Sequence, residues 1–180
     1  MPLNADLKYQ LPESLHAILQ ARLDSLSPEA RWVALLASVV GRTFWVGAVL
    51  AEARTTTGTG MLNLSSNKLE NSVTQGLSEL VRAELAFPRL GSLFSGEQEY
   101  IFKHSLLREV AYELLPHKYR KQYHMAVAHW LVTYAGADFM ATIAEHLEKA
   151  GATSEAVKQY EQAAHYARSR GALDEARWMQ

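Results

Sequence analysis

The chain contains no cysteine and no long uninterrupted apolar run. Without cysteine it can form neither disulfides nor thiolate metal sites, which agrees with the reducing cytoplasm, where we expect the protein. A membrane-spanning helix needs about 20 consecutive apolar residues. The longest candidate, Trp32–Val40, ends at Gly41. Residues 1–10 include the acidic Asp6 and no apolar core. We therefore expect neither a membrane partner nor a secretory signal.

An excess of charge of one sign is also missing. The 180 residues carry 18 Lys and Arg against 19 Asp and Glu, a formal net charge of −1. Nothing in this balance draws the chain toward nucleic acid or an anionic membrane. A hydrophobic fraction of 48% is typical of a globular protein, and the length allows one ordinary domain or two small ones with a real core.

No Gly-Lys dipeptide occurs anywhere in the chain. A P-loop needs a glycine-rich turn ending in Gly-Lys-Ser/Thr to cradle phosphates, so residues 57–60, Thr-Gly-Thr-Gly, are interpreted as part of a loop. No Ser-His-Asp or Gly-x-Ser-x-Gly arrangement is visible either. We expect no catalytic residue, no cofactor and no enzymatic activity in this chain by itself.

The most informative stretch is Tyr100–Tyr112, YIFKHSLLREVAY. Its first residues alternate as in a strand, and its later apolar residues recur at helical spacing. His104 and Ser105 lie at the junction, where Ser105 is a fair N-cap for the helix. Free N–H groups and the positive end of the helix dipole gather at such a place and suit an anion such as a phosphate.

The first part of the chain predicts helices followed by a hairpin. Ser27 is a probable N-cap and Pro28 a first-turn residue for a central core helix. The expected elements are a helix from Pro12-Glu13 to Leu26, a helix at Pro28–Val40, a turn at Arg42–Phe44, a helix at Trp45–Glu52, a loop at Arg54–Gly60, a helix within Leu62–Leu69, a helix at Asn67–Ala83, and strands at Leu85–Leu90 and Glu99–Lys103. The order helix, helix, helix, hairpin is that of a winged-helix domain.

The second part predicts helices only. After Pro116, the residues His117–Tyr134 resume a helical pattern, and from Asp138 the Ala/Leu/Tyr spacing fits a helical hairpin of the tetratricopeptide type. A second turn is expected at Arg170–Ala172. The predicted fold class is mainly α, a winged-helix domain with a short β-hairpin followed by a tetratricopeptide-like helical hairpin.

Several segments together resemble one protein family. They are LPESLHAILQARLDSLSPEAR, LLASVVGRTF, YIFKHSLLREVAYELL and the Arg120 and His124 pair in YRKQYHMAVAHWL. In this order they resemble the region after the nucleotide-binding core of STAND-type signalling ATPases, in the subgroup associated with adenylate or guanylate cyclase domains or with LuxR-type transcription regulators. The resemblance implies a linking helix at residues 1–27, a winged helix at 28–115, a connecting helix at 116–137 and the beginning of a repeat at 138–180.

The resemblance also implies a role for His104. In related ATPases a winged-helix histidine in a Met-His-Asp motif approaches the phosphates of bound ADP, and Phe102-Lys103-His104-Ser105-Leu106 is similar, with Ser105 in the aspartate position. The abrupt ends of the chain predict a piece of a longer signal-transduction protein. ATP or ADP with magnesium is then expected in that parent. The implied partners are its own nucleotide-binding and effector domains and a protein bound on the helical repeat.

Other interpretations stay open beside this one. His104 could tether hairpin to helix through a backbone hydrogen bond. For Arg22 and Asp24 we favour a structural tie between the linking helix and the winged helix over a contact with nucleotide. For Arg120 and His124 we favour a solvated or packing pair over a functional site. The spacing of the seven histidines, among them His146, does not indicate a metal site. A plain protein-interaction module is a further possibility.

A DNA-binding winged-helix regulator is the remaining alternative. Its recognition helix would be Asn67–Ala83, whose charged residues sum to zero. Because DNA affinity rests largely on clustered Lys and Arg, we regard DNA as an improbable partner.

Overall fold

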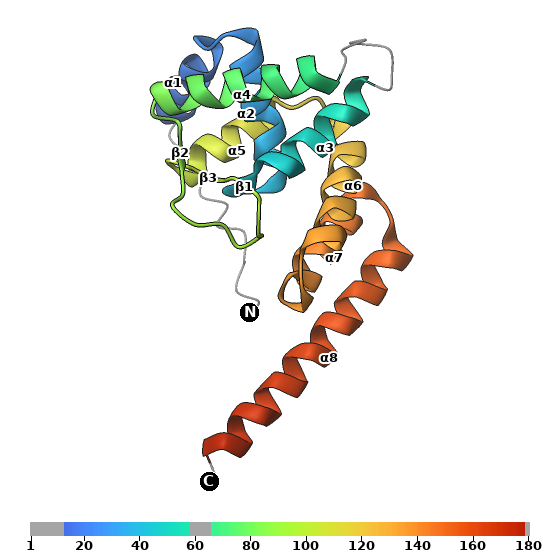
Figure 1. The fold of residues 1–180 in the computed structure, drawn as a ribbon. Coiled ribbons are helices and arrows are strands. Elements are labelled where there is room, and N and C mark those ends of the chain that lie inside the picture. Colours follow the sequence, from blue (N-terminus) through green and yellow to red (C-terminus); the bar gives the residue numbers. More distant parts are fainter. Residues whose placement is uncertain (1–12, 58–65, 179–180) are drawn as a thin grey trace, which may run out of the picture.

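The computed structural model describes residues 13–57 and 66–178. These residues are mainly helical and include a small antiparallel sheet (Figure 1). The helices are α1 (Glu13–Asp24), α2 (Pro28–Val40), α3 (Val46–Thr57), α4 (Ser66–Arg82), α5 (Ser105–Leu114), α6 (His117–Tyr134), a 3₁₀ turn η1 (Ala137–Phe139), α7 (Met140–Ala150) and α8 (Thr153–Trp178). The strands are β1 (Thr43–Trp45), β2 (Ala86–Pro88) and β3 (Glu99–Phe102). We call α1–α5 with the sheet the N-terminal body.

Helix α2 is the core helix that its sequence predicts. Ser27 is its N-cap, because the Ser27 hydroxyl accepts a hydrogen bond of 3.2 Å from the Ala30 N–H, and Pro28 occupies the first turn. Glu79 of α4 adds to this cap by accepting bonds from the N–H and the hydroxyl of Ser27 at 2.8 and 2.6 Å. Eight residues of α2 are buried, namely Ala30, Val33, Ala34, Leu36, Ala37, Ser38, Val39 and Val40.

Helix α4 packs on α2 at a glycine. A Cβ atom on Gly76 would lie 2.7 Å from Cγ2 of Val33 and 3.0 Å from the carbonyl oxygen of Glu29. Such distances are shorter than van der Waals contact, so the two helices meet here without an intervening side chain. The predicted helix at Asn67–Ala83 is confirmed, and the part of the Leu62–Leu69 prediction before Ser66 lies outside the described residues.

The sheet has the strand order β1-β3-β2, with both pairs antiparallel. Strands β2 and β3 confirm the two predicted strands, and Tyr100 and Phe102 are buried as the alternation indicates. The turn expected at Arg42–Phe44 is wrong, because Thr43–Trp45 forms β1 and pairs with β3. Three residues are too few to show a period of two, and their partner lies far along the chain.

Helix α3 is longer than predicted. It begins at Val46 instead of Trp45 and continues through Thr57, so the loop expected at Arg54–Gly60 is wrong for residues 54–57. The hydroxyl of Thr55 donates to the carbonyl of Glu52 at 2.7 Å, which lets a β-branched polar residue stay in the helix. Residues 58–60 of that expected loop lie outside the described residues.

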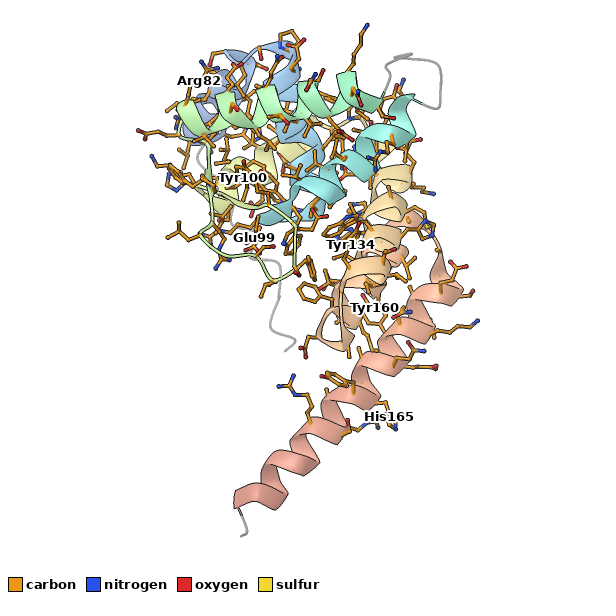
Figure 2. The ribbon with its side chains drawn as sticks, viewed as in Figure 1. Arg82, Glu99, Tyr100, Tyr134, Tyr160 and His165 are labelled. Carbon is orange, nitrogen blue, oxygen red and sulfur yellow. The ribbon has the colours of Figure 1, made fainter. Side chains whose placement is uncertain are left out.

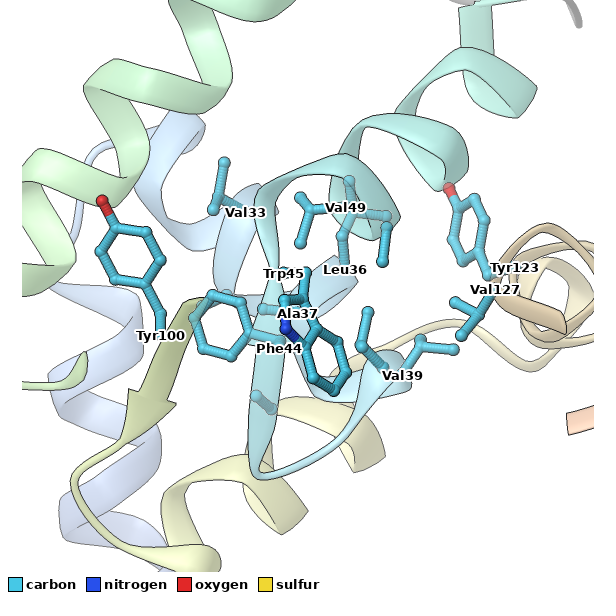
Figure 3. Packing of buried hydrophobic residues seen from close by; sticks show 14 of the residues in the cluster. Val33, Leu36, Ala37, Val39, Phe44, Trp45, Val49, Tyr100, Tyr123 and Val127 are labelled. Atoms are coloured by element: carbon cyan, nitrogen blue, oxygen red, sulfur yellow. The ribbon is translucent and has the colours of Figure 1, made fainter. Parts of the chain in front are cut away.

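One hydrophobic cluster joins the N-terminal body to α6. Figure 3 shows Phe44 and Trp45 of β1 between Tyr100 on one side and Val127 of α6 on the other. The rings of Phe44 and Tyr100 are stacked with centroids 5.8 Å apart, and those of Trp45 and Trp130 also at 5.8 Å. The body and α6 therefore share one core.

The last helices form a hairpin of α7 and α8. Gly151 ends α7 in the left-handed conformation at φ 88°. Helix α8 then runs without a break, so the second turn expected at Arg170–Ala172 is wrong. An internal glycine costs a helix only about 1 kcal/mol, which does not end it. Figures 1 and 2 show α8 extending away from the other helices. Within the described ranges, no helix is both long and apolar enough to cross a membrane.

Candidate functional site

His104 follows β3 and stands at the N-terminus of α5. Its backbone is extended (φ −131°, ψ 136°), so His104 occupies the N-cap position and Ser105 is the first helical residue. The prediction that Ser105 caps this helix is wrong by one position. The exposed side chain of His104 makes no capping hydrogen bond. The first N–H groups of α5 thus receive no side-chain cap from this residue.

A pocket of about 420 Å³ opens at this helix terminus. It is lined by Leu15, Leu19, Arg42, Lys103, His104, Ser105 and Leu106. The leucines come from α1 and α5, and the basic side chains come from the ends of β3 and from the α2–β1 connection. The pocket therefore combines apolar walls with groups that attract an anion.

The basic side chains differ in how far they are already paired. The ammonium of Lys103 forms an ion pair of 2.8 Å with the carboxylate of Glu84. The side chains of Arg42 and His104 make no hydrogen bond or ion pair with any other described residue. Both side chains line the pocket without a partner in the described part of the chain.

Arg42 is a residue that the sequence interpretation missed. Gly41, at φ 151°, turns the chain after α2, and the carbonyl of Arg42 accepts a hydrogen bond of 2.9 Å from the N–H of Phe102. This backbone contact holds Arg42 beside the end of β3 and hence beside His104. The available signal was a lone arginine after a helix-ending glycine, which by itself indicates only a turn.

Arg22 and Asp24 tie α1 to its neighbours, as predicted. The guanidinium of Arg22 donates to the carbonyl of Ala83 at 2.9 Å, beyond the end of α4. Asp24 pairs with Arg31 of α2 at 3.1 Å. Neither residue lines the pocket at His104.

Arg120 and His124 are packing residues and not a solvated pair. Arg120 donates to the carbonyls of Leu115 and Glu113, both at 3.0 Å, at the C-terminus of α5. His124 is buried, and its Nδ1 lies 2.9 Å from Nδ1 of His146. In the described part of the chain, no group of three or more His, Asp or Glu side chains could hold a metal ion.

The loop between β2 and β3 is fastened to the sheet by Glu99. The carboxylate of Glu99, only 1% exposed, accepts hydrogen bonds from the indole of Trp45 at 3.1 Å and from the N–H of Leu93 at 3.0 Å, and it pairs with Arg89 at 2.9 Å. Glu99 lies at the start of β3, beside this loop (Figure 2). Its role was not predicted, because a buried acid next to an aromatic strand has no distinctive sequence pattern.

Comparison with known proteins identifies no relative. No protein-family model matches the chain, and neither a curated protein nor a solved structure is detectably similar to it. The resemblance stated from the sequence therefore stays a prediction.

Proposed function

We propose that the chain is a regulatory interdomain module of a STAND-type signalling ATPase. In this proposal α1 links the absent P-loop core to a winged helix formed by the rest of the N-terminal body. Helices α7 and α8 begin a tetratricopeptide-like sensor. The module then couples the nucleotide bound in the P-loop core, ADP or ATP, to the activity of a cyclase or transcription effector elsewhere in the parent protein.

The observation that carries the proposal is that Arg42 and His104 lie together at the N-terminus of α5 with no hydrogen-bond or ion-pair partner among the described residues. Both line the same pocket, and neither is bonded to another described side chain. The alternative role for His104, a tether through a backbone hydrogen bond, gains no support from the described residues, to which its side chain makes no such bond. A phosphate of ADP, presented by the absent core, matches these groups in charge.

The contacts around the pocket support coupling to the rest of the molecule. The ring of His16 on α1 lies 2.9 Å from the carboxylate of Glu113 on α5, and Arg22 binds the end of α4. The aromatic cluster then connects the body to α6. A displacement of α1 on nucleotide exchange would therefore be transmitted to α5 and α6 through these contacts.

The test uses the parent protein with its P-loop core and measures ADP and ATP binding by calorimetry. We expect His104→Ala and Arg42→Ala each to weaken ADP binding about tenfold, since each removes one charge-assisted contact. In the parent, basal output should rise in parallel. His129→Ala, which changes an exposed histidine of α6, is the matched control. Unchanged ADP affinity in both pocket variants would refute the proposed contact.

The DNA-binding alternative gains no support from the exposed surface. The charged residues of α4 that face solvent, Lys68, Glu70 and Arg82, are of mixed sign. In the loop that would act as a wing, Phe94 packs against Trp130 of α6. Salt-dependent binding to duplex DNA would revive this alternative. Partner binding that depends on α7 and α8 but not on His104 would favour a plain interaction module.

A further inference from the structure

A chain of hydrogen bonds crosses the seam between the N-terminal body and the C-terminal helices. The hydroxyl of Tyr112 on α5 lies 2.8 Å from Nε2 of His124 on α6. Nδ1 of His124 lies 2.9 Å from Nδ1 of His146 on α7. The ring of His146 also faces the backbone carbonyl of Val40 at the end of α2. Four helices thus meet through two imidazoles that are 1% and 5% exposed.

The backbone carbonyl fixes the direction of every bond in this chain. The carbonyl of Val40 can only accept, so the His146 nitrogen that faces it, Nε2, must carry a proton. Nδ1 of neutral His146 is then an acceptor, and Nδ1 of His124 must donate to it. Nε2 of His124 is left as an acceptor for the hydroxyl of Tyr112. With both histidines neutral, this is the one proton arrangement that satisfies all three contacts.

The surroundings oppose any further proton. Burial is the main cause that lowers the pKa of His124 to about 3 and that of His146 to about 4. The cations that add to this effect are Lys149 of α7, Arg108 of α5 and, for His124, Arg120 of its own helix. The carbonyl of Val40 at the end of α2 acts in the opposite direction and raises the pKa of His146, and Arg42, just beyond α2, lines the crevice beside it.

The seam beside His146 is incompletely filled. A crevice of about 350 Å³ separates the ends of α2 and α5 from α7, with His146 and Lys149 on its α7 side. The acidic residues Glu109 and Glu145 also line this crevice, but no hydrogen bond or ion pair joins either of them to His146 in the described chain. Neither carboxylate is therefore positioned to compensate a charge on the pair.

We propose that His124 and His146 form an acid-sensitive latch that holds α7, and α8 with it, against the N-terminal body. A proton added to either ring reverses the direction of the bonds in this chain, so that the hydroxyl of Tyr112 must accept a hydrogen bond instead of donating one. The added positive charge is buried and lies near Lys149, Arg108 and Arg120. Release of α7 exposes both rings to water, where they can keep the proton.

The latch opens at a pH above the pKa values that His124 and His146 have in the closed form. An exposed histidine takes up a proton near pH 6.5, so the open form gains stability as soon as the pH falls below that value. With two protons involved, the ratio of open to closed molecules rises by up to about 100-fold per pH unit. A seam that is closed at pH 7 can therefore open well above pH 4.

Hydrogen exchange on the whole chain tests the latch. Between pH 7 and pH 5, after correction for intrinsic exchange rates, we expect the protection of α7 amides to fall at least about tenfold. The amides of α2 and α4 should keep theirs. The variant His124→Phe/His146→Leu should lose this pH dependence, whereas His129→Gln should retain it. Equal loss of protection in all helices of the wild-type chain would overturn the proposal.

A second measurement needs no variant and remains decisive if the double variant fails to fold. Nitrogen NMR of the wild-type histidines at pH 7 should show a proton on Nδ1 of His124 and on Nε2 of His146. In the closed form, the ring-nitrogen signals of His124 and His146 should also keep their chemical shifts near pH 6.5. Ordinary titration of all the histidines, or the opposite pair of tautomers, would contradict the latch.

Discussion

The ring of Phe94, in the loop between β2 and β3, meets the indole of Trp130 on α6 edge-on, with centroids 5.3 Å apart. Phe94 also contacts Trp45 at 4.7 Å and Phe139 of η1 at 5.0 Å. This single loop residue thus joins the sheet to the C-terminal helices. The loop acts as a clasp between the two parts of the molecule.

Phe94→Ala should accordingly destabilise the protein. Phe94 is 5% exposed, and removing its ring from the cluster should lower the free energy of unfolding by about 3 kcal/mol. Urea denaturation at pH 7 measures this loss. The neighbouring Leu93→Ala is a matched control, because Leu93 is 69% exposed and its truncation should change the free energy of unfolding by less than about 0.5 kcal/mol. Equal effects of the two variants would show that the loop does not act as a clasp.

Gly76→Ala should destabilise the protein although alanine is the better helix former. The added methyl would meet Val33 at 2.7 Å and the carbonyl of Glu29 at 3.0 Å. We expect the free energy of unfolding to fall by about 1 to 3 kcal/mol, as for other overpacked cores. In a Val33→Ala background the same change should cost less, and a double-mutant cycle in urea measures the difference. A Gly76→Ala protein as stable as the wild type would contradict the close packing of α2 and α4.

Glu52→Gln should change how stability depends on pH. The carboxyl of Glu52 is fully buried with both oxygens unpartnered, and burial raises its pKa well above the ordinary value. The folded protein therefore keeps a proton that the unfolded chain loses near pH 4.5, and stability falls as the pH rises above that value. The slope can reach about 1.4 kcal/mol per pH unit.

Urea denaturation between pH 5 and pH 9 separates this group from the histidines. Glu52→Gln should remove the loss of stability that accompanies rising pH and leave unchanged the loss caused by His124 and His146 as the pH falls below about 6.5. Glu161→Gln, on the exposed surface of α8, should follow the wild-type curve. If the wild type and Glu52→Gln have the same pH dependence, Glu52 ionises without cost.

Much of the helical framework could be predicted from local patterns. Ser27, Pro28 and an apolar run predict where α2 begins and that it is buried, because capping and first-turn preferences act within a few residues. The alternation at Tyr100–Phe102 predicts β3 and its buried face for the same reason. The change of period after His104 predicts α5.

The residues that line the pocket could be predicted only in part. His104 was identified from its place between strand and helix, but Arg42 was not, since it reaches the pocket through a backbone contact with Phe102 on a distant strand. The pairing of β1 with β3 was missed for the same reason. Such contacts depend on how separate segments are brought together, and no local pattern records that.

What the sequence by itself determined is most of the helices, strand β3 and the position of His104 at a helix N-terminus, because these follow from capping, periodicity and backbone preference over short spans. Only the tertiary structure decided that Arg42 stands beside His104, that Phe94 enters the cluster around Trp130, and that His124 meets His146. Each of these pairs joins side chains from separate elements. Their energies arise from burial and hydrogen bonding that exist only after the helices have packed.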